Sequence, residues 1–424
     1  MLEEIKLFLG TRLAKEKFNF ENIYKFVDFQ KKEKLYPEHR VIDSSPAAAE
    51  VIVNGKSVVM FSSNNYLGLS GEPEVVAAAS KALEIFGIGP GTSRLLSGNI
   101  RIYEELEEEL AKMVGKEASI FFSTGYMANE GLFKVLMDPF ASSFPFPYEK
   151  GSGTIVSDED NHNSIVTGCR LSTAERLTFK HNDMKDLERV LASLSKERRK
   201  LIVTEGSFSL EGVLSPLPKI VQLAEKYNAM TLIDDAHGVG VLGENGGGTA
   251  EYYGLQDKID VIMGSCSKAL GGMGGFVAAD KRLIEYFKVA SRSYMYSSPV
   301  SACVAYGLKE SVRLSMEGKA RRKKLNDNYR YLFDKISALG YKILGDGTVP
   351  VLPIMLHDEN IAVRANKLLF EKGVYVESFR WPAVPEGTAR MRIVPMAHHE
   401  QKHLDKLVKA LEETGKELKI FGRL

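Results

Sequence analysis

Short apolar segments that alternate with helical segments are the feature that most limits the fold of this chain. From Val75 to about Gly415, helical periodicity is interrupted by apolar runs of strand length. These runs are ASIFFS, GTIVSD, KLIVTEGS, AMTLIDDA and DVIMGSCS. Strands that alternate with helices predict a mostly parallel sheet with helices on both faces. We therefore expect an α/β protein whose ligand site lies beyond the carboxyl ends of its strands.

The two ends of the chain depart from this alternation. The first 50 residues place apolar residues at helical intervals, and Asn54-Gly55 within VIVNGKSVVM predicts a tight hairpin. After about Ser301, a long helical pattern precedes two short strands and a last helix, which predicts a smaller α+β domain. The expected division is 1–60 for an N-terminal helical and hairpin segment, 61–300 for a large domain and 301–424 for a small one. The segment 137–153 is rich in proline and aromatic residues and predicts a long loop.

Composition excludes several classes of function. The 424 residues are 44% hydrophobic and 26% charged, as in soluble globular proteins, and the net charge of +1 provides no field for nucleic acid. No apolar stretch is long enough to span a membrane, and the N-terminus lacks the pattern of a secretory signal. The three cysteines are too scattered for a disulfide framework. We expect a cytoplasmic enzyme with no nucleic-acid partner and no integral membrane association.

Lys268 is the first candidate for a chemical role. It follows an apolar strand and precedes Gly271, Gly272, Gly274 and Gly275, so a tightly packed backbone carries its amine toward the interior. A partly desolvated lysine has a lowered pKa and attacks aldehydes to form a Schiff base. The cofactor that such a lysine most often serves is pyridoxal phosphate.

This cofactor requires further groups at the neighbouring strand ends. Asp234, at the end of TLIDDAHG, provides a carboxylate for the pyridine nitrogen, although a helix cap or a metal ligand would suit it equally. His237 provides a hydrogen bond for the phenolic oxygen, and His162 provides a flat side chain to cover the ring. The sequence Ser123-Thr124-Gly125-Tyr126 places amides and hydroxyls for a phosphate where a strand turns into a helix. Ser265 and Ser267 add further hydroxyls.

Eight motifs, in order from about residue 50 to 411, resemble those of the α-oxoamine synthases. They are FSSNNYLGLS, GPGTSRLLSGN, FSTGYMANEG, DEDNHNSI, VTEGSFSLEG, LIDDAHGVGVLG, GSCSKALGG and VPEGTARMRIV. The family consists of pyridoxal-phosphate enzymes of the aspartate-aminotransferase fold, called fold type I. It includes 8-amino-7-oxononanoate synthase, serine palmitoyltransferase, 2-amino-3-ketobutyrate CoA ligase and 5-aminolevulinate synthase.

The resemblance implies a role for each matching residue. Lys268 corresponds to the Schiff-base lysine, and its catalytic partners correspond to His162, Asp234 and His237. Cofactor contacts are expected from Gly125, Tyr126, His162, Glu205, Ser209, Asp234, His237, Ser265, Lys268 and Ser298. Ser298, or its neighbour Ser297, is expected to reach the phosphate across a homodimer interface. Substrate contacts are expected from Asn64, Asn65, Arg380 and Arg392. The two arginines are expected at the substrate carboxylate.

The resemblance also implies a reaction. A small amino acid, alanine or serine, would condense with an acyl-CoA or acyl-carrier-protein thioester, losing carbon dioxide and a thiol to give an α-amino ketone. The motifs DDAHGVGVLG and GTARMRIV look most like oxononanoate synthases, whereas FSTGYMANEG and the long N-terminal lead look more like serine palmitoyltransferases. A 2-amino-3-ketobutyrate CoA ligase and an aminotransferase of the same fold remain alternatives.

The sequence His399-Glu400-Gln401-Lys402-His403 fits the H-E-x-x-H pattern of zinc enzymes. A third ligand is missing, because no histidine follows His403. An acidic residue at the start of a helix is also favoured by the helix dipole. We therefore expect no metal at this motif.

Overall fold

The computed structural model describes residues 20–32, 36, 39–138 and 153–421. The predicted N-terminal helical stretch before residue 20 and nearly all of the predicted loop at 137–153 lie outside the described residues. Within the described ranges, no helix has the length and apolar character needed to cross a membrane.

A seven-stranded sheet forms the centre of the large part of the molecule. Its strands, in spatial order, are β3 (Ala118–Phe122), β11 (Gly275–Ala279), β10 (Val261–Ser265), β9 (Met230–Asp234), β6 (Arg199–Glu205), β4 (Gly153–Asp158) and β5 (Glu175–Phe179). The run from β10 to β5 is parallel, whereas β11 pairs antiparallel with both of its neighbours. The predicted mostly parallel sheet is therefore confirmed.

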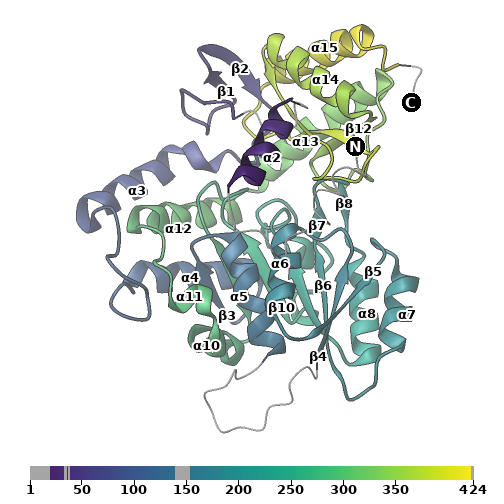
Figure 1. Cartoon of the computed structure of the whole chain (residues 1–424). Helices are drawn as coiled ribbons and strands as arrows, with labels where there is room; N and C mark the ends of the chain where they lie inside the picture. The colour runs from purple at the N-terminus through teal and green to yellow at the C-terminus, as the bar shows by residue number, and fades with distance from the viewer. Residues whose placement is uncertain (1–19, 33–35, 37–38, 139–152, 422–424) are drawn as a thin grey trace.

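Helices cover both faces of this sheet (Figure 1). They are α4 (Arg101–Val114), α5 (Gly125–Met137), α6 (Asn163–Leu171), α7 (Met184–Ala192), α8 (Leu217–Tyr227) and α10 (Lys281–Ala290). Successive strand residues point to opposite faces: Ile202 packs in the core with α4, α7 and α8, whereas Leu201 and Val203 pack with α5, α6 and α10. Two separate cores therefore hold the sheet rigid.

The C-terminal part builds a second, smaller sheet. It consists of β12 (Leu352–His357), β15 (Ala389–Ile393) and β14 (Glu377–Phe379), all antiparallel. Its helices are α13 (Lys319–Ala338), α14 (Glu359–Glu371) and α15 (Gln401–Glu417), which lie above the large sheet in Figure 1. This α+β arrangement agrees with the fold class expected from the sequence.

The predicted hairpin forms from β1 (Glu50–Val53) and β2 (Lys56–Met60), with Asn54 and Gly55 both at positive φ in its turn. Strand β2 also pairs with β13 (Val374–Tyr375), so the hairpin extends the C-terminal part. Helix α12 (Ala302–Met316) packs along α3 (Pro73–Phe86). The remaining elements are α2 (Glu21–Lys32), η1 (Leu69–Gly71), β7 (Ser207–Phe208), β8 (Val213–Leu214), α9 (Thr249–Tyr252), η2 (Gln256–Lys258) and α11 (Arg292–Met295).

Candidate active site at the strand ends

Three acidic or hydroxyl side chains end adjacent strands of the large sheet. Glu205 ends β6 and lies in register with Asp234, which ends β9; Ser265 ends the next strand, β10. Because these strands are parallel, their carboxyl ends meet at one edge of the sheet. All three residues are buried, and the chain reaches Lys268 three residues beyond Ser265. The expected convergence of strand ends is therefore confirmed.

The loop that carries Lys268 is held tightly. Gly271 has a φ of +65°, and a Cβ there would lie 2.3 Å from the backbone nitrogen of Ser70. Burial lowers the pKa of Lys268, while attraction by Asp234 and Glu205 works in the opposite direction. Among the described residues, no hydrogen bond engages the Lys268 amine. The amine is therefore available for chemistry.

Asp234 is fixed by two hydrogen bonds. Its Oδ2 accepts a bond of 2.7 Å from Asn129 Nδ2, and its Oδ1 accepts one of 3.0 Å from the Ala236 N–H. Asn129 Nδ2 also lies 2.8 Å from Ser164 Oγ. We did not predict the role of Asn129, because an asparagine inside a helix carries no signal of its own in the sequence.

His237 is held by Tyr66, whose hydroxyl lies 2.8 Å from His237 Nδ1. Burial lowers the pKa of His237 well below its usual value, and the cations Lys268 and Arg392 act in the same direction. The imidazole is therefore neutral near pH 7. Burial also raises the pKa of Tyr66 to about 12, so its hydroxyl stays protonated. The motif NNYLGLS contains Tyr66, but the sequence does not reveal this contact.

His162 caps α6 and leaves its ring exposed. Its backbone N–H donates to Glu205 Oε1 at 2.7 Å, and its Nδ1 lies 2.7 Å from Ser164 Oγ. Burial, reinforced by repulsion from Asp234, raises the pKa of Glu205 well above its usual value. The structure brings His162 and Glu205 together on the side of the site next to Asp234.

The N-terminus of α5 lies beside Ser265. Thr124 caps the helix by accepting a 3.1 Å bond from the Met127 N–H, and a Cβ on Gly125 would lie 3.5 Å from Ser265 Oγ. Ser265 Oγ is in turn 2.9 Å from Ser267 Oγ. The hydroxyl of Tyr126 points to α6, where it contacts Asn163 and Thr167.

The segment after α11 reaches the same helix end. The exposed Ser298 lies there, and its carbonyl accepts a 2.7 Å bond from Ser123 Oγ.

Arg392, on β15, brings the C-terminal part to the site. It donates to Ser209 Oγ at 3.0 Å and to Asn64 Oδ1 at 2.9 Å. Asn65 instead supports its own segment, because its amide donates to the Ala47 carbonyl and accepts from the Ser70 N–H. Arg380 is partly buried just after β14.

The donor set fits pyridoxal phosphate. Lys268 provides a desolvated amine, Asp234 a buried carboxylate and His237 a neutral imidazole. A helix N-terminus lies beside Ser265, and its Gly125 leaves room that a Cβ would occupy. These are the groups that an aldehyde, a pyridine nitrogen, a phenolic oxygen and a phosphate need.

The H-E-x-x-H segment is structural instead. His399 Nδ1 accepts from the Met396 N–H at 3.0 Å, and its Nε2 lies 2.9 Å from the Met60 carbonyl. His403 Nδ1 accepts from the Glu400 N–H, and its Nε2 lies 3.0 Å from a carboxylate oxygen of Glu50. Over the described ranges, no group of three or more histidine, cysteine or acidic residues is arranged to hold a metal ion.

Comparisons with known proteins identify the family of this chain. The model for aminotransferase class I and II matches residues 56–411. The chain is 40% identical to the 8-amino-7-oxononanoate synthase of Thermosipho melanesiensis, over 95% of the chain and 100% of the relative. It is 38% identical to the synthase of Fervidobacterium nodosum, over 95% and 100% respectively.

Solved structures extend the likeness to three dimensions. Serine palmitoyltransferase of S. paucimobilis with bound PLP and myriocin superposes with a TM-score of 0.88 at 31% identity, covering 96% of this chain and 100% of that one. The 8-amino-7-oxononanoate synthase of Francisella tularensis gives a TM-score of 0.72 at 25% identity, covering 86% and 98%. The predicted fold type I is therefore confirmed, and the chain belongs to the α-oxoamine synthases within the aminotransferase class I and II family.

Proposed function

We propose that this chain is a pyridoxal-phosphate-dependent acyltransferase that condenses a small amino acid with an acyl-CoA thioester. Carbon dioxide and the free thiol leave, and an α-amino ketone remains. The observation that carries the proposal is the Lys268 amine, which is desolvated beside Asp234 and Glu205 and engaged by no hydrogen bond among the described residues. Alanine is the favoured amino acid, because the relatives at 38–40% identity are named 8-amino-7-oxononanoate synthases.

Each residue of the site has a task in this reaction. When bound, pyridoxal phosphate supplies an aldehyde for the amino group and a protonated ring that withdraws electrons from the substrate Cα. Lys268 would hold the cofactor covalently, and its amine would move the proton at the substrate Cα. Asp234, oriented by Asn129, would hold the proton on the ring nitrogen. His237, neutral and oriented by Tyr66, offers a hydrogen bond to the phenolic oxygen.

The cofactor's other contacts follow from the same geometry. Gly125 and Ser265 would hold the phosphate at the N-terminus of α5, and His162 would cover the ring. Tyr126 and Ser298 flank this helix end within the same chain. The reach of Ser298 to the phosphate across a dimer interface stays a prediction. Glu205 would hold the start of α6 in place through the 2.7 Å bond that it accepts from the His162 N–H.

The amino-acid carboxylate is assigned to Arg392. Its guanidinium is partly buried and donates to two neutral acceptors, Ser209 and Asn64. In the part of the chain that the structure describes, no carboxylate forms an ion pair with it. A buried cation without an anionic partner is a site that a substrate carboxylate would neutralise. Arg380 and Asn65 are proposed to line the same substrate pocket.

Serine is the second candidate amino acid. The likeness to serine palmitoyltransferase structures covers 96% of the chain at a TM-score of 0.88. Alanine and serine differ by only one hydroxyl, so a preference between them separates the two activities weakly. The preferred acyl donor separates them more sharply.

The surface supports a homodimer with shared active sites. Large apolar side chains are exposed along the end of α3 and the segment that follows it, and Ile88 is 88% exposed. The others in this group are Leu83, Ile85, Phe86, Leu95 and Leu96. Several exposed large apolar side chains in one stretch of the chain favour a subunit interface there. The free thiols of Cys169, Cys266 and Cys303 suit a reducing compartment such as the cytoplasm.

A matrix of small amino acids against acyl-CoAs of different chain length tests the proposal, with thiol release as the readout. We expect release that depends on both substrates, greatest with alanine, together with carbon dioxide in equal amount. Borohydride should fix the cofactor on the peptide that contains Lys268. Transfer of the amino group to a keto acid, without thiol release, would establish an aminotransferase instead.

A further inference from the structure

Strand β15 directs two arginines at the hairpin that β7 and β8 form. Arg390 and Arg392 are separated by a single residue in a strand, so their side chains point to the same face. Arg392 contacts Ser209, and Arg390 contacts the next two residues, Leu210 and Glu211. All three contacted residues lie between β7 and β8 of the large part of the molecule. The carboxylate-binding arginine and its neighbour therefore hold the same loop.

The contacts of Arg390 are those of a structural anchor. Its Nη1 donates to the Leu210 carbonyl and to Glu211 Oε1, both at 3.0 Å, and its Nε donates to the Thr388 carbonyl at 3.1 Å. The side chain of Arg390 is 7% exposed and that of Glu211 is 25% exposed. An ion pair this buried loses more than a surface pair when one partner is removed, because the other charge stays desolvated.

The hairpin has little room to shift against the C-terminal part. A Cβ on Gly345 would lie 2.4 Å from the Gly212 carbonyl oxygen, and one on Gly212 would lie 3.2 Å from Pro353. Strand β12, which contains Pro353, pairs directly with β15 opposite Arg392. A change in the position of the hairpin is therefore transmitted to the strand that carries Arg392.

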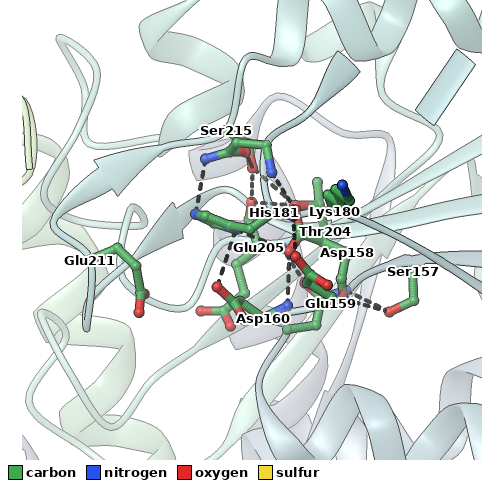
Figure 2. Close-up of polar contacts among 12 residues, drawn as sticks. Ser157, Asp158, Glu159, Asp160, Lys180, His181, Thr204, Glu205, Glu211 and Ser215 are labelled. Atoms are coloured by element: carbon green, nitrogen blue, oxygen red, sulfur yellow. Dashed lines mark hydrogen bonds and ion pairs between the residues drawn. The ribbon is translucent and has the colours of Figure 1, made fainter. Parts of the chain in front are cut away.

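A second cluster fixes the hairpin from the large sheet (Figure 2). His181 Nδ1 lies 3.0 Å from Asp158 Oδ1, and the His181 ring packs edge-on against Phe208 with 4.5 Å between the ring centroids. Asp158 also accepts from the Asp160 N–H, in the turn that leads to His162. Phe208 precedes Ser209. The hairpin is therefore held on one side by His181 and Asp158 and on the other by Arg390.

We propose that Arg390 and Glu211 are positioning residues that keep Arg392 and Ser209 in the geometry that binds the amino-acid carboxylate. The inference rests on the proposed function, since it assigns Arg392 to a substrate carboxylate. Neither Arg390 nor Glu211 contacts the substrate. They set the position of the hairpin relative to β15. That position decides whether Nη1 and Nη2 of Arg392, which now donate to Ser209 and Asn64, can both reach the substrate carboxylate.

The test compares two ligands of the holoenzyme, alanine and ethylamine, which is the same amine without the carboxylate. Dissociation constants come from the change in visible absorption on titration of wild type, Glu211→Gln, Arg390→Gln and the double variant. We expect alanine to bind about 10- to 100-fold more weakly in each single variant, the range expected for small misplacement of a binding group. The double variant should bind alanine no more weakly than the weaker-binding single variant, because both changes break the same interaction. Ethylamine affinity should change less than about twofold in each variant.

Glu244→Gln is the matched control. Glu244 pairs with Lys319 at 2.9 Å, and this pair also joins the large part of the molecule to a C-terminal helix, α13. The control should leave alanine affinity unchanged. If Glu211→Gln does not fold, Glu211→Asp retains the charge with a shorter reach and should show the same contrast between alanine and ethylamine.

Two results would overturn the inference. Equal weakening of alanine and ethylamine would show general loosening of the site, and unchanged alanine affinity in both single variants would show that the pair has no positioning role. Failure of the proposed function is separate from both, because it would appear in the wild type as an absence of thiol release that depends on an amino acid and an acyl-CoA.

Discussion

The strand-end site and the histidine segment 399–403 both bury titratable side chains, but they use them differently. Both ring nitrogens of His399 are hydrogen bonded within the chain, and so are those of His403. At the strand ends, the Lys268 amine is engaged by no hydrogen bond in the described structure, and Arg392 donates to neutral groups. Lys268 therefore has hydrogen-bonding capacity left for a ligand, whereas the rings of His399 and His403 have none. The neighbouring His398, whose buried ring nitrogens have no hydrogen-bond partner among the described residues, shows that unused capacity alone does not mark a reactive group.

The pKa values alone would not separate the two regions. Burial lowers the pKa of His399 to about 3 and that of His237 well below its usual value. Both imidazoles are therefore neutral near pH 7. They differ in their partners: His399 is held by two backbone groups, whereas His237 is held by Tyr66 at one nitrogen.

Removal of Lys268 should give the largest effect. We expect Lys268→Ala to lower the rate of thiol release by at least about 10⁴-fold, because both the covalent link and the proton transfer are lost. The matched control is Lys116→Ala. Burial also lowers the pKa of Lys116, but its amine already donates to the carbonyls of Gln256 and Ile259. A control that loses as much activity as Lys268→Ala, while remaining folded, would break the comparison.

Asp234→Asn should lower kcat by about 10²- to 10⁴-fold, because the ring nitrogen loses the carboxylate that keeps it protonated. Steady-state kinetics with saturating cofactor measure the effect. The control is Asp260→Asn, since Asp260 is another acid at the sheet whose oxygen accepts from the Thr231 N–H and hydroxyl. Activity of Asp234→Asn within twofold of wild type would remove this residue from the mechanism.

Asp235 lies next to Asp234, but its carboxylate is hydrogen bonded by the Thr249 N–H and hydroxyl. Burial raises its pKa to about 6. Because the folded-state pKa lies above the unfolded one, its contribution to stability is complete below about pH 4 and is lost as pH rises through 6. The free energy of unfolding of wild type, relative to Asp235→Asn, should therefore fall by about 2 kcal/mol from pH 4 to pH 7. A difference that is constant with pH would contradict this assignment.

His399→Leu should act on stability alone. We expect the free energy of unfolding to fall by about 1–3 kcal/mol, because the Met396 N–H and the Met60 carbonyl lose their buried partner. Activity per folded molecule should be unchanged, and so should activity after treatment with a chelator. Stoichiometric zinc that is lost in this variant would instead make the histidine segment a metal site.

Much of the sheet could be predicted, but two strands could not. The five predicted strands are continuous apolar runs because they are buried on both faces. Strand β5 lies at the sheet edge and reads ERLTF, so most of its side chains are not buried and the apolar signal is absent. Strand β11 reads GFVAA directly after the glycines, where its small residues resemble a loop. The division into domains at residues 60 and 300 stays a prediction.

For the site, the strand-end residues could be predicted and the residues that hold them could not. Lys268, Asp234 and His237 were expected because each follows a strand of a parallel sheet. Asn129 and Tyr66 reach the site from a helix and from a loop remote in sequence. Arg390 and Glu211 are 179 positions apart, and nothing in their local sequence indicates that they pair. The catalytic roles themselves stay predictions until the variants are measured.

The order of strands, helices and polar strand ends was determined by the sequence alone, since burial on both faces of a parallel sheet leaves a local pattern of apolar runs. Only the tertiary structure decided which hydrogen-bonding groups are used up and which are left for a ligand. That difference depends on partners brought together from distant parts of the chain, and local periodicity carries no record of them.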